Sequence, residues 1–463
     1  MPHPTPARDG LSTREYVGYA LGDTASNLFF KAFGIFFPQY FYVEVCGLNP
    51  VPVATMILIS RAWDAVNDPM MGLIADRTRT RWGKFRPYLL WMAVPFGIAG
   101  YLLYTSPDGS HGAKLAWAYV TYNLMMMAYT AINVPYSSLL GVISPSPAVR
   151  TVASSFRFAG AFLGGLIVYL SAKPLVRALG GGNEAQGFAE MGAIFSGLAI
   201  VMFLLCFGLT KERVTPPPAQ KTNVAEELGE LLRNGPWVFL LFAAIFSTAF
   251  QFLRDSTALV YIKYVLKDDG VPLWFGFMDR FTIFMSLGAV CQILGVVCLG
   301  VVARRIDKGR LAAILSIVTA LCYGICYFLP PDNFPLLVAV NCLATFAMGP
   351  TSALVWAMYG DVADYGEWKF GRRSTGLIYS ASLFALKTGT MIAGWLGPMI
   401  MHWTGYVRGA EQSPESIAGL MVSFSLLPMV FALLKGVMIW IYPLTQAKLD
   451  VIERDLAARR ASA

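Results

Sequence analysis

The chain has 463 residues, of which 56% are hydrophobic and only 14% charged, and its mean hydropathy is +0.55. These values lie outside the balance of soluble domains and indicate an integral membrane protein. The net charge of +8 does not indicate a nucleic-acid partner, because the basic residues lie in short loops between hydrophobic runs, where membrane topology accounts for them.

Twelve hydrophobic runs are long enough to cross a membrane, which takes about 20 mostly apolar residues. The sequence therefore predicts an all-α membrane protein with twelve transmembrane helices. The predicted spans are 16–44, 51–75, 87–105, 114–140, 151–173, 189–210, 237–263, 274–302, 311–329, 335–360, 375–402 and 416–442.

The distribution of basic residues predicts how the chain is oriented. With the N-terminus in the cytoplasm, 23 of the 36 Lys and Arg residues fall in cytoplasmic tails and loops. Cytoplasmic loops of membrane proteins are enriched in Lys and Arg. We therefore expect a multi-pass protein of the plasma membrane, or of the inner membrane in a bacterium, with both termini in the cytoplasm.

A polar stretch between the sixth and seventh spans divides the chain into two halves. Each half has its most basic short loop after its second span, at 76–84 and at 304–310. Matching features at matching positions indicate a duplicated unit, with a solute site near the membrane midplane. The predicted domains are a six-helix bundle at 1–210, a cytoplasmic loop at 211–236, and a second, pseudo-symmetric six-helix bundle with a cytoplasmic tail at 237–463.

The second span carries a stripe of charge. Arg61, Asp64 and Asp68 are spaced i, i+3 and i+7, so a helix places them on one face, with Asn67 beside it. A charge at the centre of a span costs at least a few kcal/mol, so this stripe must face polar groups. We expect the two carboxylates to bind a coupling cation and Arg61 to balance their charge.

The nature of the coupling ion stays open between Na⁺ and H⁺. Asp64, Asp68, Asn67 and Thr130 offer the oxygen ligands that small hard cations prefer. Two close carboxylates can instead share a proton. The amide and the hydroxyl are needed by Na⁺ but not by a proton, so the sequence favours Na⁺.

Further polar groups within the spans predict a cavity for a solute. Ion pairs that only hold helices together are the alternative explanation. A whole set of such pairs would be a costly way to pack helices, so we favour a binding site for a polar, hydroxyl-rich solute. The expected binding residues are Asp23, Asn27, Tyr129, Asn133, Arg157 and Lys387.

Other charged and reactive residues receive different interpretations. Lys435 on the twelfth span is expected to extend toward the inner membrane surface. The pairs Arg254–Asp255 and Asp279–Arg280 are expected to form a gate or ion pairs between spans seven and eight. The histidines are scattered and no nucleophile, phosphate-loop or zinc motif occurs, so neither an enzyme, nor a cofactor, nor a metal other than a possible Na⁺ is expected.

Two sequence signatures resemble those of the glycoside-pentoside-hexuronide:cation symporters. The first runs from Arg61 to Gly72 and continues from Arg79 to Pro87; the second, from Asp361 to Arg373, resembles the loop after the tenth span of the family. The resemblance covers almost the whole chain. It implies the major facilitator fold and transport by alternating access.

The resemblance also implies roles for individual residues. It assigns Asp64 and Asp68 to the cation, with Asn67 and Thr130 as neutral ligands. Arg157 matches the sugar-binding arginine of the family, and Lys387 matches its lysine near the cation site.

Several positions depart from members of the melibiose-permease type. In those members Asp23 is a lysine, Thr24 and Asn133 are sugar-binding aspartates, and Ser137 is a tryptophan. The departures predict a glycoside or monosaccharide other than melibiose. Lys31 and Arg157 leave an acidic sugar, such as a hexuronide, as an alternative.

The sequence therefore predicts a secondary active symporter that couples inward Na⁺ or H⁺ movement to uptake of a sugar, working as a monomer in the lipid bilayer. The alternatives are a cation-coupled transporter of a non-sugar amphiphile and a membrane sensor that transports nothing. Cytoplasmic ion pairs are expected to hold the outward-open state. The gating residues expected to form them are Asp76, Arg81, Lys84, Asp361, Asp364 and Arg372.

Overall fold

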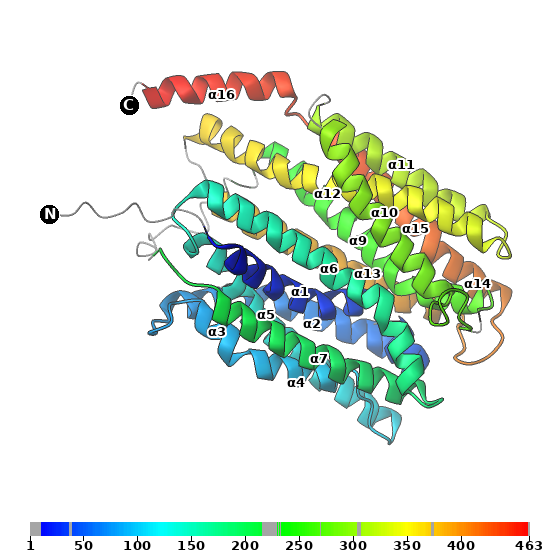
Figure 1. Ribbon diagram of the computed structural model, residues 1–463. Helices are drawn as coiled ribbons and strands as arrows, with labels where there is room; N and C mark the ends of the chain where they lie inside the picture. Colours follow the sequence, from blue (N-terminus) through cyan, green and yellow to red (C-terminus); the bar gives the residue numbers. More distant parts are fainter. Residues whose placement is uncertain are drawn as a thin grey trace. The chain divides into compact units, whose positions relative to one another are not determined.

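The computed structural model describes residues 11–36, 39–214, 229, 231, 233–268, 270–302, 307–371 and 375–461. Within these residues the regular structure is helical, apart from two isolated β-bridges. The chain divides into two compact units (Figure 1). The first comprises residues 1–219 and 274–278, and the second comprises 220–273 and 279–463.

The first unit contains six membrane-spanning segments. The third of them is divided into α3 and α4, and a short π-helix, η1, follows the first. Its helices are α1 (Thr13–Phe36), η1 (Gln39–Val45), α2 (Pro50–Arg77), α3 (Arg86–Trp91), α4 (Ala93–Leu103), α5 (His111–Val142), α6 (Pro147–Leu179) and α7 (Glu184–Leu209).

The second unit contains six further segments and a C-terminal helix. A π-helix, η2, interrupts the last span. Its helices are α9 (Gly235–Tyr264), α10 (Arg280–Val302), α11 (Lys308–Phe328), α12 (Phe334–Phe370), α13 (Thr375–Trp403), α14 (Pro414–Met421), η2 (Val422–Leu426), α15 (Leu427–Trp440) and α16 (Gln446–Ala461). The two units give the described residues twelve spanning segments, so the predicted fold class is confirmed.

Seven helices of the described chain are long and apolar enough to cross a membrane by length and composition alone. Helix α2 is not among them. Arg61, Asp64 and Asp68 lie in its middle and lower its hydropathy. The candidate site therefore lies on a span that is too polar to be recognised by length and hydropathy alone.

Polar caps explain where many of the helices begin. Asn49 accepts a hydrogen bond from the backbone of α2, Ser110 from α5 and Ser146 from α6. In the second unit Asp307 caps α11 and Asn333 caps α12 in the same way. These side chains satisfy backbone N–H groups that have no partner within the helix.

Glycines allow pairs of helices to approach closely in both units. On α6, a side chain at Gly160 or Gly164 would overlap the backbone of α1. On α12, one at Gly349 would overlap the backbone of α10, and on α13, one at Gly389 would overlap α9. Small residues at such crossings are the usual means of packing helices in membranes.

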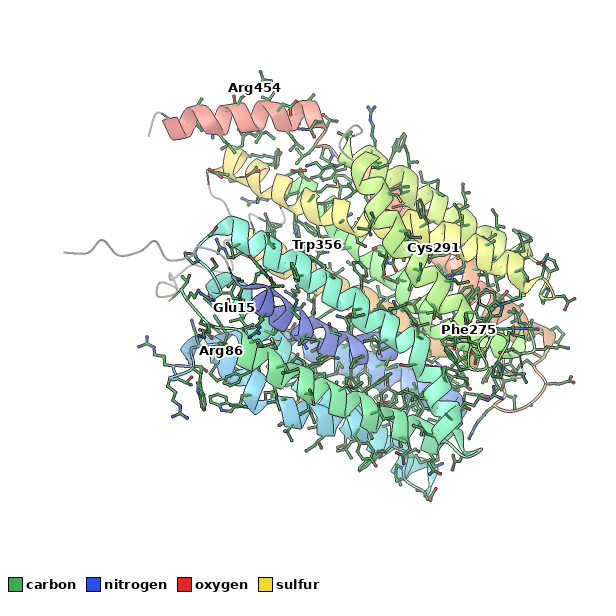
Figure 2. All side chains as sticks on the ribbon, viewed as in Figure 1. Glu15, Arg86, Phe275, Cys291, Trp356 and Arg454 are labelled. Atoms are coloured by element: carbon green, nitrogen blue, oxygen red, sulfur yellow. The ribbon has the colours of Figure 1, made fainter. Side chains whose placement is uncertain are left out.

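Residues 211–214 attach to the end of the first unit where α3 begins. The Glu212 carboxylate accepts hydrogen bonds from the backbone N–H groups of Lys84, Phe85 and Arg86, at 2.7–2.8 Å. Arg213 forms an ion pair with Glu15 of α1. Glu15 and Arg86 lie at this same end of the unit (Figure 2). The first residues of the expected central loop therefore hold α1 and the α2–α3 connection together.

Helix α12 corrects the interpretation of the second signature. Residues 361–370 continue α12 instead of forming a loop. The helix ends at Gly371, whose φ of 74° is left-handed and whose N–H donates to the Glu367 carbonyl at 2.9 Å. This is the common way in which glycine ends a helix. Helix α16, which was not predicted, contacts α12; the Trp368 indole N–H donates to Asp455 of α16 at 2.9 Å.

Lys435 does not extend to the inner surface, so that prediction is wrong. The residue is 1% exposed. Its ammonium group donates to Thr351 Oγ1 at 2.8 Å and to Ser247 Oγ at 3.1 Å. These two hydroxyls lie inside the second unit, on α12 and α9, and satisfy the ammonium group there.

Arg254 also has other partners than predicted. Its guanidinium donates to the Phe424 carbonyl of η2 at 2.7 Å and to Asn341 Oδ1 of α12 at 3.1 Å. Asp279 caps α10 by accepting from the Thr282 N–H at 2.8 Å, and Arg280 pairs with Asp268 at 3.7 Å. Arg254 thus joins α9 to the last span and to α12 by hydrogen bonds, and its contact with span eight is with the Phe284 ring of α10, 5.8 Å from the centroid.

Candidate functional site

A hydroxyl group joins the two acidic residues of α2. Thr130 Oγ1 on α5 lies 3.0 Å from Asp64 Oδ1 and 2.8 Å from Asp68 Oδ1. Asp64 is 4% exposed. A hydroxyl carries one proton and can donate to only one of the two oxygens at a time. The carboxylate oxygen that does not receive the proton then lies close to the hydroxyl oxygen. That contact is favourable only if a bound proton or cation supplies positive charge there.

Arg61 lies on the same face of α2 as the two acids. Its guanidinium is 3.9 Å from Asp64 Oδ2, a loose ion pair. Within the described residues the buried Arg61 Nε has no hydrogen-bond partner. Asn67 directly precedes Asp68 in the sequence and is partly exposed. The geometry therefore gives Asp64 a positive neighbour on one side and a hydroxyl on the other.

A second buried ion pair joins α1 to α6. Arg157 Nε donates to Asp23 Oδ2 at 3.1 Å, and Asp23 is 9% exposed. Arg157 Nη2 donates to Ser137 Oγ of α5 at 3.2 Å. The guanidinium also lies over the Tyr136 ring, 5.2 Å from its centroid. These contacts fix the plane of the guanidinium.

Helix α5 connects the two ion-pair clusters. Thr130, Asn133 and Ser137 are spaced i, i+3 and i+7, so they lie on one face of the helix. Thr130 contacts the acids of α2, and Ser137 contacts Arg157 of α6. Between them, Asn133 Oδ1 accepts from Ser26 Oγ of α1 at 2.6 Å. One polar stripe on α5 thus reaches three neighbouring helices.

The remaining predicted binding residues of the first unit lie beside this stripe. The Asn27 amide donates to the Asp23 carbonyl at 2.9 Å, and the Asn133 amide donates to the Tyr129 carbonyl at 3.1 Å. The Tyr129 ring packs near Phe30, with 6.3 Å between ring centroids. Between helices, the side-chain hydrogen bonds of this predicted set include those of Asp23 with Arg157 and of Asn133 with Ser26.

The second unit holds one predicted site residue and two predicted gating acids. Lys387 lies partly buried on α13, and Asp364 lies partly buried on α12. Asp361 accepts from the Lys308 ammonium group with both oxygens, at 2.8 and 3.0 Å. This contact joins α11 to α12 within the second unit.

The gating residues on the basic loops are described only in part. The Arg81 guanidinium stacks on the Trp82 ring, 4.4 Å from its centroid, and the Lys84 ammonium group lies 5.3 Å from the Phe85 centroid. The side chain of Asp76 and the whole of Arg372 lie outside the described residues. The gating assignment stays a prediction.

Sequence reasoning did not find Ser26, Tyr136 or the role of Ser137. Ser26 lies three residues after Asp23 and so shares its face of α1, which was an available signal. The Tyr136 hydroxyl donates to the Tyr19 carbonyl at 2.6 Å, a contact that only packing creates. Ser137 was recognised solely as the replacement of a tryptophan; its bond to Arg157 depends on the α5–α6 distance.

Two helical units, each with six spanning segments, have the architecture of the major facilitator fold. Comparison with solved structures supports this fold. The chain superposes on a structure from a study of proton-dependent oligopeptide transporters with a TM-score of 0.68 and 12% identity, covering 96% of this chain and 100% of the other. It superposes on a D-xylose–proton symporter with a TM-score of 0.64 and 14% identity, covering 93% and 97%.

Sequence comparison identifies the family. A family described as "MFS/sugar transport protein" matches residues 18–446. The inner membrane symporter YicJ of Escherichia coli K12 is 33% identical, covering 96% of this chain and 95% of that protein. The isoprimeverose transporter of Lactiplantibacillus pentosus is 32% identical (96% and 90%), and the glucuronide carrier protein homolog of E. coli K12 is 31% identical (97% and 96%). The chain belongs to the glycoside-pentoside-hexuronide:cation symporter family of the major facilitator superfamily. It is a transporter and not an enzyme.

Proposed function

We propose that the protein is a secondary active symporter that couples inward movement of Na⁺ to uptake of a sugar by alternating access. The single observation that carries the coupling proposal is the Thr130 hydroxyl, which lies within 3.0 Å of both Asp64 and Asp68. The relatives named as symporters and sugar carriers support the cargo.

The coupling ion binds where three oxygen-bearing side chains meet. Carboxylate and hydroxyl oxygens are the ligands that small hard cations take, and Asn67 adds an amide beside them. Na⁺ between Asp64 and Asp68 removes the repulsion between the two carboxylates. It also balances the negative charge of the carboxylate oxygen to which the Thr130 hydroxyl does not donate. A proton shared by the two acids would do the same, and is the alternative coupling ion.

Cation binding prepares the sugar site through α5. Thr130 and Asn133 lie on one face of this helix, so a shift of Thr130 toward the bound ion is passed to the contacts of Asn133 and Arg157. An inward cation gradient then supplies the work, about 2.3 kcal/mol per charge for each 100 mV of membrane potential. We place the protein in the bacterial inner membrane with both termini in the cytoplasm.

Proteoliposomes test this proposal. A panel of radiolabelled glycosides, pentosides and hexuronides is offered with a Na⁺ gradient or a H⁺ gradient imposed separately. Wild-type protein is expected to accumulate a sugar against its gradient when Na⁺ is imposed. Accumulation under a H⁺ gradient alone would show that the coupling ion is H⁺ and not Na⁺.

Substitution of the acids tests the site itself. Asp64→Asn and Asp68→Asn keep the shape of the side chain but remove its charge, so both should abolish gradient-driven accumulation. Exchange of sugar at equal concentrations on the two sides is the control for folded protein. Concentrative uptake by both variants at the wild-type level would refute the assignment.

A further inference from the structure

We infer that Asp23 determines the charge class of the substrate: by neutralising Arg157, it makes the site select an uncharged, hydroxyl-rich sugar over a sugar acid. This inference rests on the proposed sugar symport and narrows its substrate class.

The ion pair between Asp23 and Arg157 is close and largely buried. Arg157 Nε and Asp23 Oδ2 are 3.1 Å apart, and the two side chains are 26% and 12% exposed. Within the described residues, the hydrogen bonds of Arg157 use Nε and Nη2, the latter toward Ser137. The Tyr136 ring covers one face of the guanidinium at 5.2 Å. Arg157 is therefore held in place and its charge is balanced before any solute binds.

A sugar carboxylate at Arg157 would bring a second negative charge next to Asp23. In surroundings of low dielectric constant, two like charges a few ångströms apart repel strongly. A uronic acid would have to bind Arg157 against this repulsion, or displace Asp23 and leave a buried carboxylate without its partner. The site thus discriminates against an anion by repulsion, as specific sites commonly do.

An uncharged sugar meets complementary groups at the same place. A hydroxyl can donate to a carboxylate and accept from a guanidinium at once, so neighbouring hydroxyls of a sugar ring fit an intact Asp23–Arg157 pair. The surrounding side chains Ser26, Asn27 and Asn133 are neutral, and the amide N–H groups of both asparagines donate to backbone carbonyls. The cluster therefore offers polarity without net charge.

The other cations of the first unit's spans do not replace Arg157 as an anion partner. Lys31 lies eight residues beyond Asp23, about 12 Å further along α1, with its ammonium group 5.8 Å from the Tyr169 ring centroid. Arg61 lies 3.9 Å from Asp64. The selection against acids is therefore expected to depend on Asp23 itself.

Binding to the purified full chain tests the inference. Isothermal titration calorimetry in Na⁺ is carried out with matched probes: methyl glycosides of glucose and galactose, their uronic acid counterparts, and a pentose series. Wild-type protein is expected to bind a neutral member at least about tenfold more tightly than any uronic acid. Asp23→Asn, which keeps the shape but frees the charge of Arg157, should raise uronic acid affinity relative to the neutral sugar by about tenfold or more.

Two further variants separate charge from shape. Ser137→Ala removes a hydrogen bond to Arg157 but no charge, so the ratio of neutral to acidic affinity should not change. Asp23→Asn combined with Arg157→Gln removes both charges and should give no gain for the uronic acid. Thermal unfolding followed by tryptophan fluorescence shows which variants are folded. Tighter binding of a uronic acid by wild-type protein overturns the inference even where a variant is unstable.

The possible outcomes distinguish this inference from the proposed function. Tighter binding of a uronic acid by wild-type protein, or an unchanged ratio in folded Asp23→Asn, would overturn the inference and leave sugar symport standing. Binding of no sugar in the panel, with no uptake under either cation gradient, would overturn the proposed function and this inference with it.

Discussion

The Thr130 hydroxyl is the contact through which α5 meets both acids of α2. A hydrogen bond to a charged group is worth about 1.5–3 kcal/mol. Its oxygen is also placed to join the ligands of a cation between Asp64 and Asp68. We therefore propose that this residue affects the affinity for the coupling ion more than the affinity for the sugar.

Replacing this hydroxyl gives a prediction at the residue scale. Thr130→Val keeps the branched shape and removes the oxygen, so half-maximal activation of uptake should need about 10–100 times more Na⁺. Thr130→Ser retains the oxygen and should stay within a few-fold of wild type. The measurement is initial uptake as a function of Na⁺ concentration. Equal Na⁺ dependence of all three proteins would argue against Thr130 as a ligand.

Lys435 presents a different residue-scale case, because the partners found for its ammonium group are hydroxyls. Thr351 Oγ1 also lies 2.7 Å from the Met348 carbonyl, so it keeps a partner without the lysine. Buried charges are often replaced by apolar groups of similar volume at no loss of stability.

Lys435→Met is therefore expected to leave thermal stability in detergent unchanged or raised. Lys435→Ala, the matched control, leaves a cavity and should cost about 2–4 kcal/mol. Thermal unfolding of the three purified proteins makes the comparison. If the methionine variant unfolded as early as the alanine variant, the positive charge would be required for stability.

At the scale of elements, the crossing of α1 and α6 determines where Asp23 meets Arg157. A Cβ added at Gly164 would lie 2.6 Å from the Thr24 carbonyl oxygen and 2.9 Å from Asn27 Cβ. Since one of these atoms belongs to the backbone, the helices would have to separate. The ion pair is therefore possible because glycine lies at this position.

Gly164→Ala should destabilise the protein by about 1–3 kcal/mol through overpacking and should weaken sugar binding. Gly197→Ala on α7 is the matched control, because nothing lies within 4 Å of the added carbon. It should not destabilise the protein. Thermal unfolding and sugar binding are measured for both. A Gly164→Ala protein as stable as the control would show that the crossing tolerates a side chain.

At the scale of the whole molecule, the basic loops and the helix count make a prediction about topology. An even number of spans places both termini on one side, and the Lys and Arg distribution predicts that this side is the cytoplasm. Alkaline phosphatase fused after residue 463 should be inactive, whereas fusion in the 104–110 loop should be active. Activity at the C-terminus would reverse the orientation.

The sequence by itself determined the membrane class, the twelve spans and the acids of α2, because hydrophobic length and i, i+3, i+7 spacing are local properties of the chain. Asn27 and Asn133 were predicted as binding residues from the same kind of spacing, and that role stays a prediction. The ends of spans were less well predicted: α12 runs on to Gly371, since its polar signature remains compatible with a helix.

Only the tertiary structure decided which partner each buried charge receives. Lys435 turned out to bind two hydroxyls and Arg254 a carbonyl of η2, because their neighbours come from helices distant in sequence. For the same reason Ser137 could not be recognised as a partner of Arg157, nor Lys308 as that of Asp361. A sequence shows that a charge within a span must be satisfied, whereas the packing of the helices decides which group satisfies it.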